Sequence, residues 1–457
     1  MKELHRAGMS TNHPATPSEH PRAIAPESVR AAIEHFAACR PDAEAVVMDG
    51  RTLTYSELCA RSNRLADQLL LQGVGPEVPV GLLCERGLEA MVGMLAILAA
   101  DGVCVPFDPS LPTERLRTMI ALAGLRLVVT TESMQRARTA VDGPVALVRV
   151  DGPPPRAPNL QSRLRPENTA CIHFTAGPGG RPRAVPVSHA ASENLIRWQR
   201  TALPLEPGAR VLQFSPPGLD SAWQEIASTL SSGGTLVLPP PDRLATPTAL
   251  LELMIDAHIS RAHLPAATLA HLADASNTAA RTLPHLRDVV AICGPVLVSH
   301  EIRAFFTSHP QCRLHAHYGH AETLVAFSHT VSGSPATWPS ILPLGRPIRS
   351  VAPVLLDPVD QQPARGDAGE LWIGGPYQAR NYHRDPVATR ERFRPDPFAP
   401  EGSTARIFRT GDHVRLDEDG VFELSRPGVP SNRAPTKGGR KTVLPSRLHD
   451  QSTRQPA

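Results

Sequence analysis

The sequence predicts an α/β protein in which mainly parallel sheets are covered by helices. Three observations support this prediction. Short apolar runs of strand length alternate with longer segments of helical periodicity over residues 29–130. A second stretch of the same kind covers residues 170–329, and from residue 342 to residue 424 the pattern changes to short strands with tight turns. We therefore expect two mainly parallel α/β subdomains followed by a smaller β-rich subdomain.

The first subdomain is expected at about residues 26–150. Apolar residues at helical spacing and short β-branched runs alternate along it, which is typical of strands and helices that cover one another. In the helix that follows Thr54, for example, Leu58, Leu65 and Leu69 face one way. The pattern predicts helices at 29–39, 55–72, 88–100 and 112–123, and strands at 45–48, 52–54, 80–83, 103–107 and 127–130.

The second subdomain is expected at about residues 166–330 and the third at 340–424, after a Pro-rich linker at 151–166. The two ends, residues 1–25 and 425–457, are polar and lack apolar periodicity, so both are expected to be disordered. The folded region is therefore residues 26–424. Within the second subdomain the pattern predicts helices near 188–200, 222–231, 247–257 and 266–273.

The composition excludes several classes of protein. The 47 Lys and Arg residues nearly balance the 44 Asp and Glu residues, which argues against a nucleic-acid or membrane-surface partner. No apolar stretch reaches the ~20 residues that span a bilayer, so no membrane segment is expected. The seven cysteines are scattered without CxxC pairs, which favours buried thiols in a cytoplasmic protein over structural zinc.

A glycine-rich turn follows an apolar strand at residues 172–176. Residues 175–180 read T-A-G-P-G-G, and Arg183 comes shortly afterwards. Glycines allow backbone N–H groups to surround phosphate oxygens, and a nearby cation adds charge. The segment thus has two interpretations, a phosphate-binding loop or a surface Gly/Pro loop, and taken alone it does not decide between them.

Two acidic residues stand after tight turns. Glu322 ends the segment Y-G-H-A-E at residues 318–322, and one carboxylate can hold a Mg²⁺ ion that bridges ATP phosphates. Asp412 ends F-R-T-G-D at residues 408–412, and its two oxygens suit the two hydroxyls of a ribose. Taken singly, each also fits a plain interpretation, a solvated charge for Glu322 and an Asx turn for Asp412.

Taken together and in this order, these segments resemble the core motifs of the adenylate-forming superfamily. Within it, they are most similar to the amino-acid adenylation domains of nonribosomal peptide synthetases. The resemblance implies the large N-terminal domain of that fold, ATP and Mg²⁺ as cofactors, and activation of an amino acid as aminoacyl-AMP. It implies transfer to a carrier protein, or contact with other synthetase modules. The remaining segments that carry it are residues 53–58, 98–115, 369–375, 379–382 and 391–393.

The resemblance assigns roles position by position. Arg183 and Glu322 are the expected catalytic residues: Arg183 stands where the phosphate loop of the family has Lys, and Glu322 would bind Mg²⁺. Tyr318 would stack on adenine, and Asp412 would bind the ribose. Asp220 matches the acid that pairs with the substrate ammonium, which disfavours an acyl-CoA or aryl-acid ligase because the carboxylate would then be unpaired. The remaining ATP-binding positions are Thr175, Gly177, Gly179, Gly180 and Gly319, and the remaining pocket positions are Ser221, Gln224, His317, Val325 and Ala326.

Gln224 and His317 predict a polar or mid-sized substrate side chain.

Two departures from the family point to a second hypothesis. Ala176 and Pro178 replace hydroxyl residues of the phosphate loop, and Pro178 also lacks an N–H group. Residues 425–457, with Gly428 at the hinge position, do not resemble the family's C-terminal lid, as a truncation or a frameshift would produce. The alternative is a catalytically poor pseudoenzyme that binds a nucleotide, an amino acid or a synthetase partner.

Overall fold

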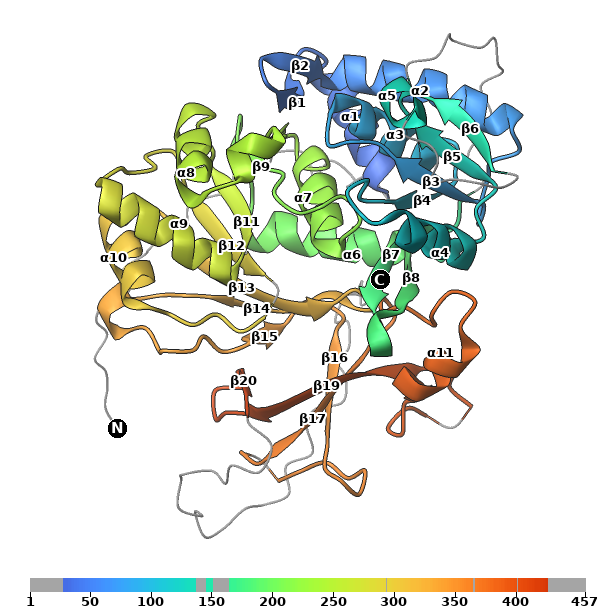
Figure 1. Cartoon of the computed structure of the whole chain (residues 1–457). Helices are drawn as coiled ribbons and strands as arrows, with labels where there is room; N and C mark the ends of the chain where they lie inside the picture. The colour runs from blue at the N-terminus through green and yellow to red at the C-terminus, as the bar shows by residue number, and fades with distance from the viewer. Residues whose placement is uncertain are drawn as a thin grey trace, which may run out of the picture.

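The computed structural model describes residues 28–136, 145–150, 164–292, 294–364, 366–400 and 402–425. The expected disordered ends and most of the expected linker lie outside these ranges. The described residues form three sheets, two large and mainly parallel and one small and antiparallel. Figure 1 shows the two large sheets side by side, with the small sheet below them. The predicted α/β class and the β-rich third part are confirmed.

A six-stranded sheet, with strand order β6-β5-β3-β4-β7-β8, is parallel except where β7 and β8 form a hairpin. Its strands are β3 (Pro79–Leu83), β4 (Val103–Pro106), β5 (Leu127–Thr130), β6 (Ala146–Arg149), β7 (Thr169–Ala176) and β8 (Pro182–Ser188). The accompanying helices are α1 (Val29–Cys39), α2 (Tyr55–Leu71), α3 (Leu88–Ala99), α4 (Thr113–Ala123), α5 (Glu132–Arg136) and α6 (His189–Ala202), with a 3₁₀ turn η1 (Pro178–Gly180).

The nine-stranded sheet has the order β15-β14-β13-β12-β11-β9-β10-β1-β2. Its strands are β1 (Glu44–Met48), β2 (Arg51–Thr54), β9 (Arg210–Leu212), β10 (Thr235–Val237), β11 (Arg261–Pro265), β12 (Asp288–Ile292), β13 (Arg313–His320), β14 (Leu324–Thr330) and β15 (Arg346–Pro347). The accompanying helices are α7 (Asp220–Leu230), α8 (Pro247–Asp256), α9 (Ala266–Ala279) and α10 (His300–Ser308), with 3₁₀ turns η2 (Pro241–Leu244) and η3 (Pro335–Thr337).

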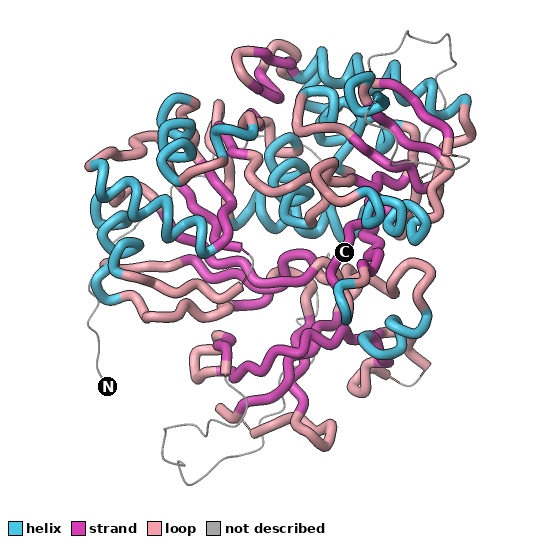
Figure 2. Tube along the Cα trace, in the orientation of Figure 1, coloured by secondary structure: helices cyan, strands magenta, loops and turns pink. Residues whose placement is uncertain are grey.

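The small sheet is antiparallel throughout, as the short strands and tight turns of the sequence predict. Figure 2 shows helices gathered around the two large sheets, while the small sheet consists of strands and loops beside one short helix. Its elements are β16 (Ala352–Leu356), β17 (Ala368–Gly374), α11 (Pro386–Arg392), β18 (Phe393–Pro395), β19 (Arg406–Leu416) and β20 (Phe422–Leu424).

The sheets do not follow the segment boundaries expected at about residues 150 and 166. Strands β1 and β2 come from the first segment, yet β1 pairs with β10 of the nine-stranded sheet. Strands β7 and β8 come from the second segment, yet β7 pairs with β4 of the six-stranded sheet. The two large sheets also share one core, in which Val46 and Leu236 of one sheet and Leu82 of the other belong to a single buried cluster.

Local signals explain where several helices begin. The Thr54 hydroxyl caps α2 by accepting from the Glu57 N–H, and the Glu57 carboxylate accepts from the Thr54 N–H, which completes a capping box. Tyr55 follows in the first turn and is fully buried, and its hydroxyl donates to the carbonyls of Leu230 (3.0 Å) and Gly234 (2.8 Å). This side chain therefore links α2 to the end of α7.

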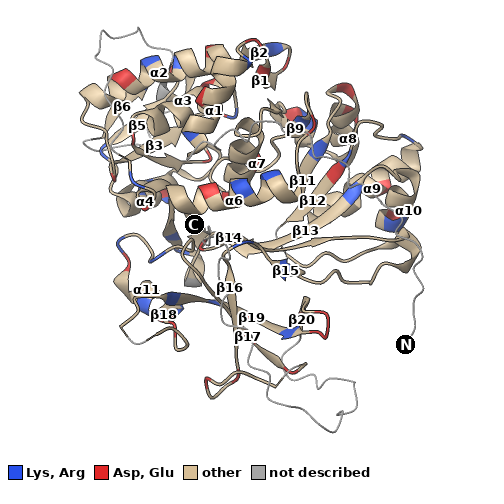
Figure 3. Cartoon of the chain, turned by 180° about the vertical axis from the view of Figure 1, so that it is seen from behind, with Lys and Arg blue, Asp and Glu red and all other residues tan. Residues whose placement is uncertain are grey.

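Helix α6 carries charged residues at the surface, whereas helix α3 is apolar and lies in the interior. Figure 3 shows residues of both charges along the visible face of α6, where Arg197 pairs with Glu193. Helix α3 is apolar on all sides and is buried along almost its whole length. Among the described residues, the helices fall short of the length and apolarity that crossing a membrane requires.

Candidate active site

The β13–β14 hairpin positions two of the expected site residues. Its register shifts between Tyr318 and Gly319, and Gly319 lies so close to the Leu324 carbonyl that a Cβ atom there would overlap it. The backbone of Leu324 itself adopts a positive φ of 53°. The tight turn that results presents His320 and Glu322 toward the small sheet.

Asp412 lies against this hairpin and interacts with two of its side chains. The Tyr318 hydroxyl donates to Oδ2 of Asp412 at 2.5 Å, and His320 Nε2 lies 3.4 Å from the same oxygen. The backbone N–H of Asp412 donates to the hydroxyl of Thr410 (3.0 Å), which fixes the T-G-D turn. The hydrogen bond with His320, aided by that with Tyr318, holds the pKa of Asp412 below its ordinary value. The carboxylate is thus kept ionised and oriented.

Glu322 is 5% exposed and is held by a residue of the small subdomain. The Tyr382 hydroxyl donates to its Oε1 at 2.6 Å, and the Ala379 N–H donates to its carbonyl at 2.7 Å. The guanidinium of Arg183 lies 5.1 Å from the centre of the Tyr382 ring. One aromatic side chain therefore contacts both residues that were expected to act on ATP phosphates.

Arg183 lies on β8 with its side chain 12% exposed, and its Nη2 is 3.2 Å from Oε2 of Glu391 on α11. In the hairpin register it pairs with Thr175 of β7. Its guanidinium is therefore close to the glycine-rich loop and is balanced by a solvent-exposed carboxylate.

The glycine-rich loop is the turn of the β7–β8 hairpin. The Gly177 N–H donates to the Arg181 carbonyl (2.8 Å), and the Gly180 N–H donates to the Gly177 carbonyl (3.1 Å). Gly179 and Gly180 have φ values of 68° and 77°, which glycine adopts readily. Two backbone donors of the expected phosphate loop are thus occupied by bonds inside the loop itself.

Asp220 begins α7 and is partly buried. Burial raises the pKa of its carboxyl above the ordinary value, while the N–H groups of Ser221 and Asp220 and the charge of His320 act in the opposite direction. Because His320 also lies beside Asp412, the imidazole is electrostatically linked to both acids. Glu322 thus lies in the turn itself and Asp412 contacts the residues beside it, while the charge of His320 acts on Asp220.

The expected side-chain pocket residues are only partly brought together. Ser221 follows Asp220 in the first turn of α7, and both Ser221 and Gln224 are buried. Gln224 Nε2 lies 3.1 Å from His317 Nδ1, and the His317 ring packs edge-on against Trp198 with ring centres 5.2 Å apart. Trp223 of the same helix is 1% exposed and packs in the core.

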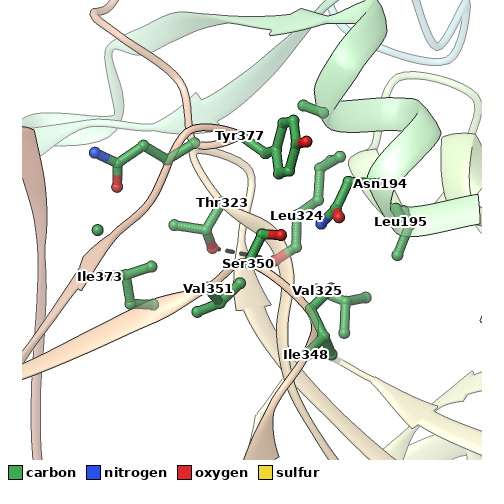
Figure 4. Close-up of a pocket in the computed structure, with 13 residues that line it drawn as sticks. Asn194, Leu195, Thr323, Leu324, Val325, Ile348, Ser350, Val351, Ile373 and Tyr377 are labelled. Carbon is green, nitrogen blue, oxygen red and sulfur yellow. Dashed lines mark hydrogen bonds between the residues drawn. The ribbon is translucent and has the colours of Figure 1, made fainter. Parts of the chain in front are cut away.

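Val325 and Ala326 belong to different environments. Ala326 packs in a cluster with Leu344 and Leu371 beneath the small sheet. Val325 lines a small, mostly apolar pocket between α6 and the start of β14 (Figure 4). This pocket does not contain the three acids; its other lining residues include Leu195, Thr323, Ile348, Ser350 and Tyr377.

Three residues of the site were not predicted, namely His320, Tyr382 and Glu391. Each lies inside a segment that the sequence marked, but the signal there was the order of the motifs and not a role for these side chains. Their roles follow from contacts between residues far apart in the chain, such as the 60 positions between Tyr382 and Glu322.

Comparison with known proteins gives a consistent result. The model of the AMP-binding enzyme family matches residues 33–383. Phosphinothricin tripeptide synthetase PhsB from Streptomyces viridochromogenes is 34% identical over 393 residues, which is 84% of this chain and 32% of that protein. Tyrocidine synthase 2 from Brevibacillus parabrevis is 32% identical over 388 residues, which is 84% of this chain and 11% of that protein. The chain thus spans about a third or less of these relatives.

Solved structures share the fold. The AMPPNP-bound form of the nonribosomal peptide synthetase FmoA3 superposes with a TM-score of 0.80 at 26% identity, over 90% of this chain and 43% of that chain. The N-terminal subdomain of NpsA from Klebsiella oxytoca superposes with a TM-score of 0.73 at 22% identity, over 87% of this chain and 99% of that chain. The second likeness shows the fold alone.

Proposed function

Because this chain belongs to the AMP-binding enzyme family, we propose that it activates an amino acid as aminoacyl-AMP in nonribosomal peptide synthesis. The observation that supports the proposal most strongly is the arrangement around the β13–β14 turn. Asp412 contacts Tyr318 and His320, the charge of His320 counteracts the effect of burial on the pKa of Asp220, and Glu322 lies in the middle of the same turn. In this proposal Asp412 would bind the sugar, Asp220 the ammonium group and Glu322 the metal ion.

In the proposed reaction, a carboxylate oxygen of the amino acid attacks the α-phosphorus of ATP in line with the departing pyrophosphate. The new acyl–phosphate bond forms as the bond between the α-phosphorus and the bridging oxygen breaks. Positioning and charge stabilisation supply most of the catalysis in such a transfer. Asp220 would hold the ammonium, Asp412 the ribose and Tyr318 the adenine. Arg183 and the glycine-rich loop would lie beside the phosphates.

Mg²⁺ fits the carboxylate of Glu322. Magnesium is commonly held by one or two carboxylates together with substrate phosphates. Glu322 is buried, and its Oε1 accepts the Tyr382 hydroxyl, which leaves Oε2 for a metal. When bound, the ion would neutralise charge on the phosphates, while Tyr382 keeps the carboxylate oriented.

The proposed partner is a carrier protein, whose thiol would take the acyl group from aminoacyl-AMP. The relatives named above are peptide synthetases, and this chain matches one segment of each. A carrier protein or another synthetase module is therefore the partner that the proposed reaction requires.

A second candidate is a nucleotide or amino-acid binder with poor catalysis. The observation that favours it is the glycine-rich loop, in which the N–H groups of Gly177 and Gly180 are bonded internally. Pro178 provides no N–H at all, and loss of a single donor to a developing charge costs about a hundredfold or more in rate. In this candidate the three acids would still bind ligand.

Pyrophosphate–ATP exchange with a panel of amino acids tests the proposal. We expect exchange above background with at least one amino acid, and a loss of that exchange in Asp220→Ala. Calorimetric titration with Mg·ATP runs in parallel. ATP binding without exchange for any amino acid would contradict the enzyme and support the binder, and the absence of both would contradict both candidates.

A further inference from the structure

A chain of buried polar side chains runs from α7 to α6. The hydroxyl of Ser228 donates to the backbone carbonyl of Gln224 at 2.5 Å, because a carbonyl oxygen can only accept. Gln199 Nε2 donates to the Ser228 oxygen at 3.1 Å, and Gln199 Oε1 in turn accepts from Gln224 Nε2 at 3.1 Å. The direction of every bond in this chain is thus fixed by the carbonyl at its end.

The chain ends at His317, whose protonation follows from it. The second hydrogen of Gln224 Nε2 points to His317 Nδ1 at 3.1 Å, so Nδ1 accepts. Burial lowers the pKa of His317 well below its ordinary value, so the ring is neutral. A neutral imidazole that accepts at Nδ1 carries its proton on Nε2. That Nε2–H group is buried and has no partner among the described residues.

His263 provides a second set of unpaired nitrogen atoms. In the sheet register, His263 of β11 lies next to Val290 of β12, and Val290 lies next to His315 of β13. His317 is two residues beyond His315, so the side chains of His263 and His317 lie on the same face of the sheet. His263 is 1% exposed, and neither ring nitrogen has a partner within the described part of the chain. Burial lowers the pKa of His263 to about 3, so its neutral ring offers one donor and one acceptor.

These unpaired groups are unfavourable unless a ligand satisfies them. A buried donor without an acceptor costs about 1–3 kcal/mol, and native structures contain few such groups. Because Gln224 is bonded to both Gln199 and His317, the His317 ring is oriented before any ligand arrives. Their arrangement indicates a polar ligand that offers an acceptor to His317 Nε2–H and a donor to a ring nitrogen of His263.

The proposed ammonium site, Asp220, lies one helical turn from Gln224, which contacts His317. Asp220 and Gln224 are four residues apart on α7, so they face the same way with their Cβ atoms about 6 Å apart. An amino acid whose ammonium pairs with Asp220 would extend its side chain along α7 toward Gln224 and His317. A side chain whose terminal atoms lie three or four bonds beyond Cα spans such an offset.

We propose that the activated amino acid carries a side-chain carboxamide, as glutamine and asparagine do. Its carbonyl oxygen would accept from His317 Nε2–H, and its NH₂ group would donate to a ring nitrogen of His263. A carboxylate is disfavoured because two neutral imidazoles provide no charge to offset its burial. An alkyl side chain is disfavoured because it leaves the His317 donor and the His263 acceptor unpaired. The inference rests on the proposed function and adds the class of substrate.

Amino-acid-dependent pyrophosphate exchange is the test, with glutamine and asparagine compared with glutamate, aspartate, leucine and methionine. We expect kcat/KM for the better amide to exceed that of every other member by at least about tenfold, as in sites built to hydrogen-bond their substrate. Preference for an apolar or an acidic side chain would overturn the inference and leave the proposed function standing. No exchange with any amino acid would contradict the proposed function instead.

Variants at position 317 separate recognition from folding. His317→Phe keeps a ring and removes the donor, so KM for the amide should rise at least about tenfold. The ratio of kcat/KM for leucine to kcat/KM for the amide should rise as well. His317→Gln restores a donor near Nε2 and should recover part of the discrimination. His271→Ala, an exposed position on α9, serves as the control. If His317→Phe retains its fold and its full preference for the amide, His317 does not contribute to recognition of the substrate side chain.

Discussion

The Tyr382 hydroxyl donates a 2.6 Å hydrogen bond to Oε1 of Glu322, although 60 residues separate the two in sequence. Both side chains are buried, at 3% and 5% exposure. Tyr382→Phe would leave the carboxylate without this donor. Because hydrogen bonds to charged groups contribute about 1.5–3 kcal/mol, we expect the free energy of unfolding to fall by that amount in urea titrations.

The same variant should weaken Mg·ATP binding, because Glu322 would no longer be oriented by the hydroxyl. Titration calorimetry with and without Mg²⁺ measures this effect. Tyr377→Phe is the matched control, since Tyr377 lies nearby in the pocket of Figure 4 and is only partly buried. Equal losses of stability and of Mg²⁺ dependence in the two variants would contradict the role given to Tyr382.

Arg183 should contribute to ATP use through its charge. Arg183→Ala removes the cation beside the glycine-rich loop, and we expect the exchange rate to fall by about a hundredfold. Glu391→Gln removes only the carboxylate that pairs with Arg183, so the guanidinium would be freed for phosphates. Exposed ion pairs contribute about 0.2–1 kcal/mol, so ATP binding should tighten by no more than about fivefold.

Fluorescent-nucleotide titration at low and high salt checks the second effect. Tightening in Glu391→Gln should diminish as salt rises, because the pair is exposed to solvent. Weaker binding in this variant would show that Glu391 supports the nucleotide site and does not compete for Arg183.

Glu225 should make stability depend on pH. It is fully buried on α7, and burial raises its pKa from 4.5 to about 8 despite hydrogen bonds from Ser215 and Gln213. Between these pH values the folded protein holds a proton that the unfolded chain releases, so stability is lost as pH rises. The contribution amounts to at most about 1.4 kcal/mol per pH unit.

Glu225→Gln removes this titrating group. Urea unfolding of the wild type and the variant at pH 5, 6.5 and 8 gives the difference between the two at each pH. We expect the variant to gain stability relative to the wild type as pH rises over this range. A difference that stays constant with pH would mean that Glu225 does not change its protonation on folding.

Asp288 is the centre of a buried ionic cluster. It lies 2.7 Å from Arg261 Nη2, 2.8 Å from Arg313 Nη2 and 3.0 Å from His315 Nε2. Burial alone would raise the pKa of Asp288, but His315 and Arg261 hold it well below its ordinary range. Asp288→Ala leaves the buried Arg261 without its partner, so we expect a loss of about 3–5 kcal/mol in the free energy of unfolding.

Asp256→Ala provides the comparison. Its pair with Arg243 lies at the surface, with the Asp256 side chain 61% exposed, and should contribute no more than about 1 kcal/mol. Similar losses in the two variants, measured by urea unfolding at pH 7, would contradict the importance of burial.

The helices could be predicted because their signals are local. Helix α2 begins at Tyr55, as the Thr54 and Glu57 pattern indicates, and α1 has the predicted bounds. Helix α9 was predicted to end at residue 273, yet it continues to Ala279. Polar residues in its last turns obscure the apolar period, although Ser276 there is buried. The helix therefore depends on packing that the sequence pattern does not show.

The site could be predicted only in part. The order of the motifs indicated Asp220, Glu322 and Asp412 as site residues, and their roles stay predictions. The pairing of Tyr382 with Glu322 and of Tyr318 with Asp412, 94 residues apart, could not be predicted. Side chains that meet in this way are brought together by sheets and loops that the intervening residues build.

By itself the sequence determined the fold class and the approximate positions of the elements. These depend on periodicity and on residue type, which are local properties of the chain. Only the tertiary structure decided that β1 joins β10, that β7 joins β4, and that His320 lies beside Asp412. Such neighbours depend on the burial of apolar surface shared by distant segments, and local patterns carry no record of which segments will meet.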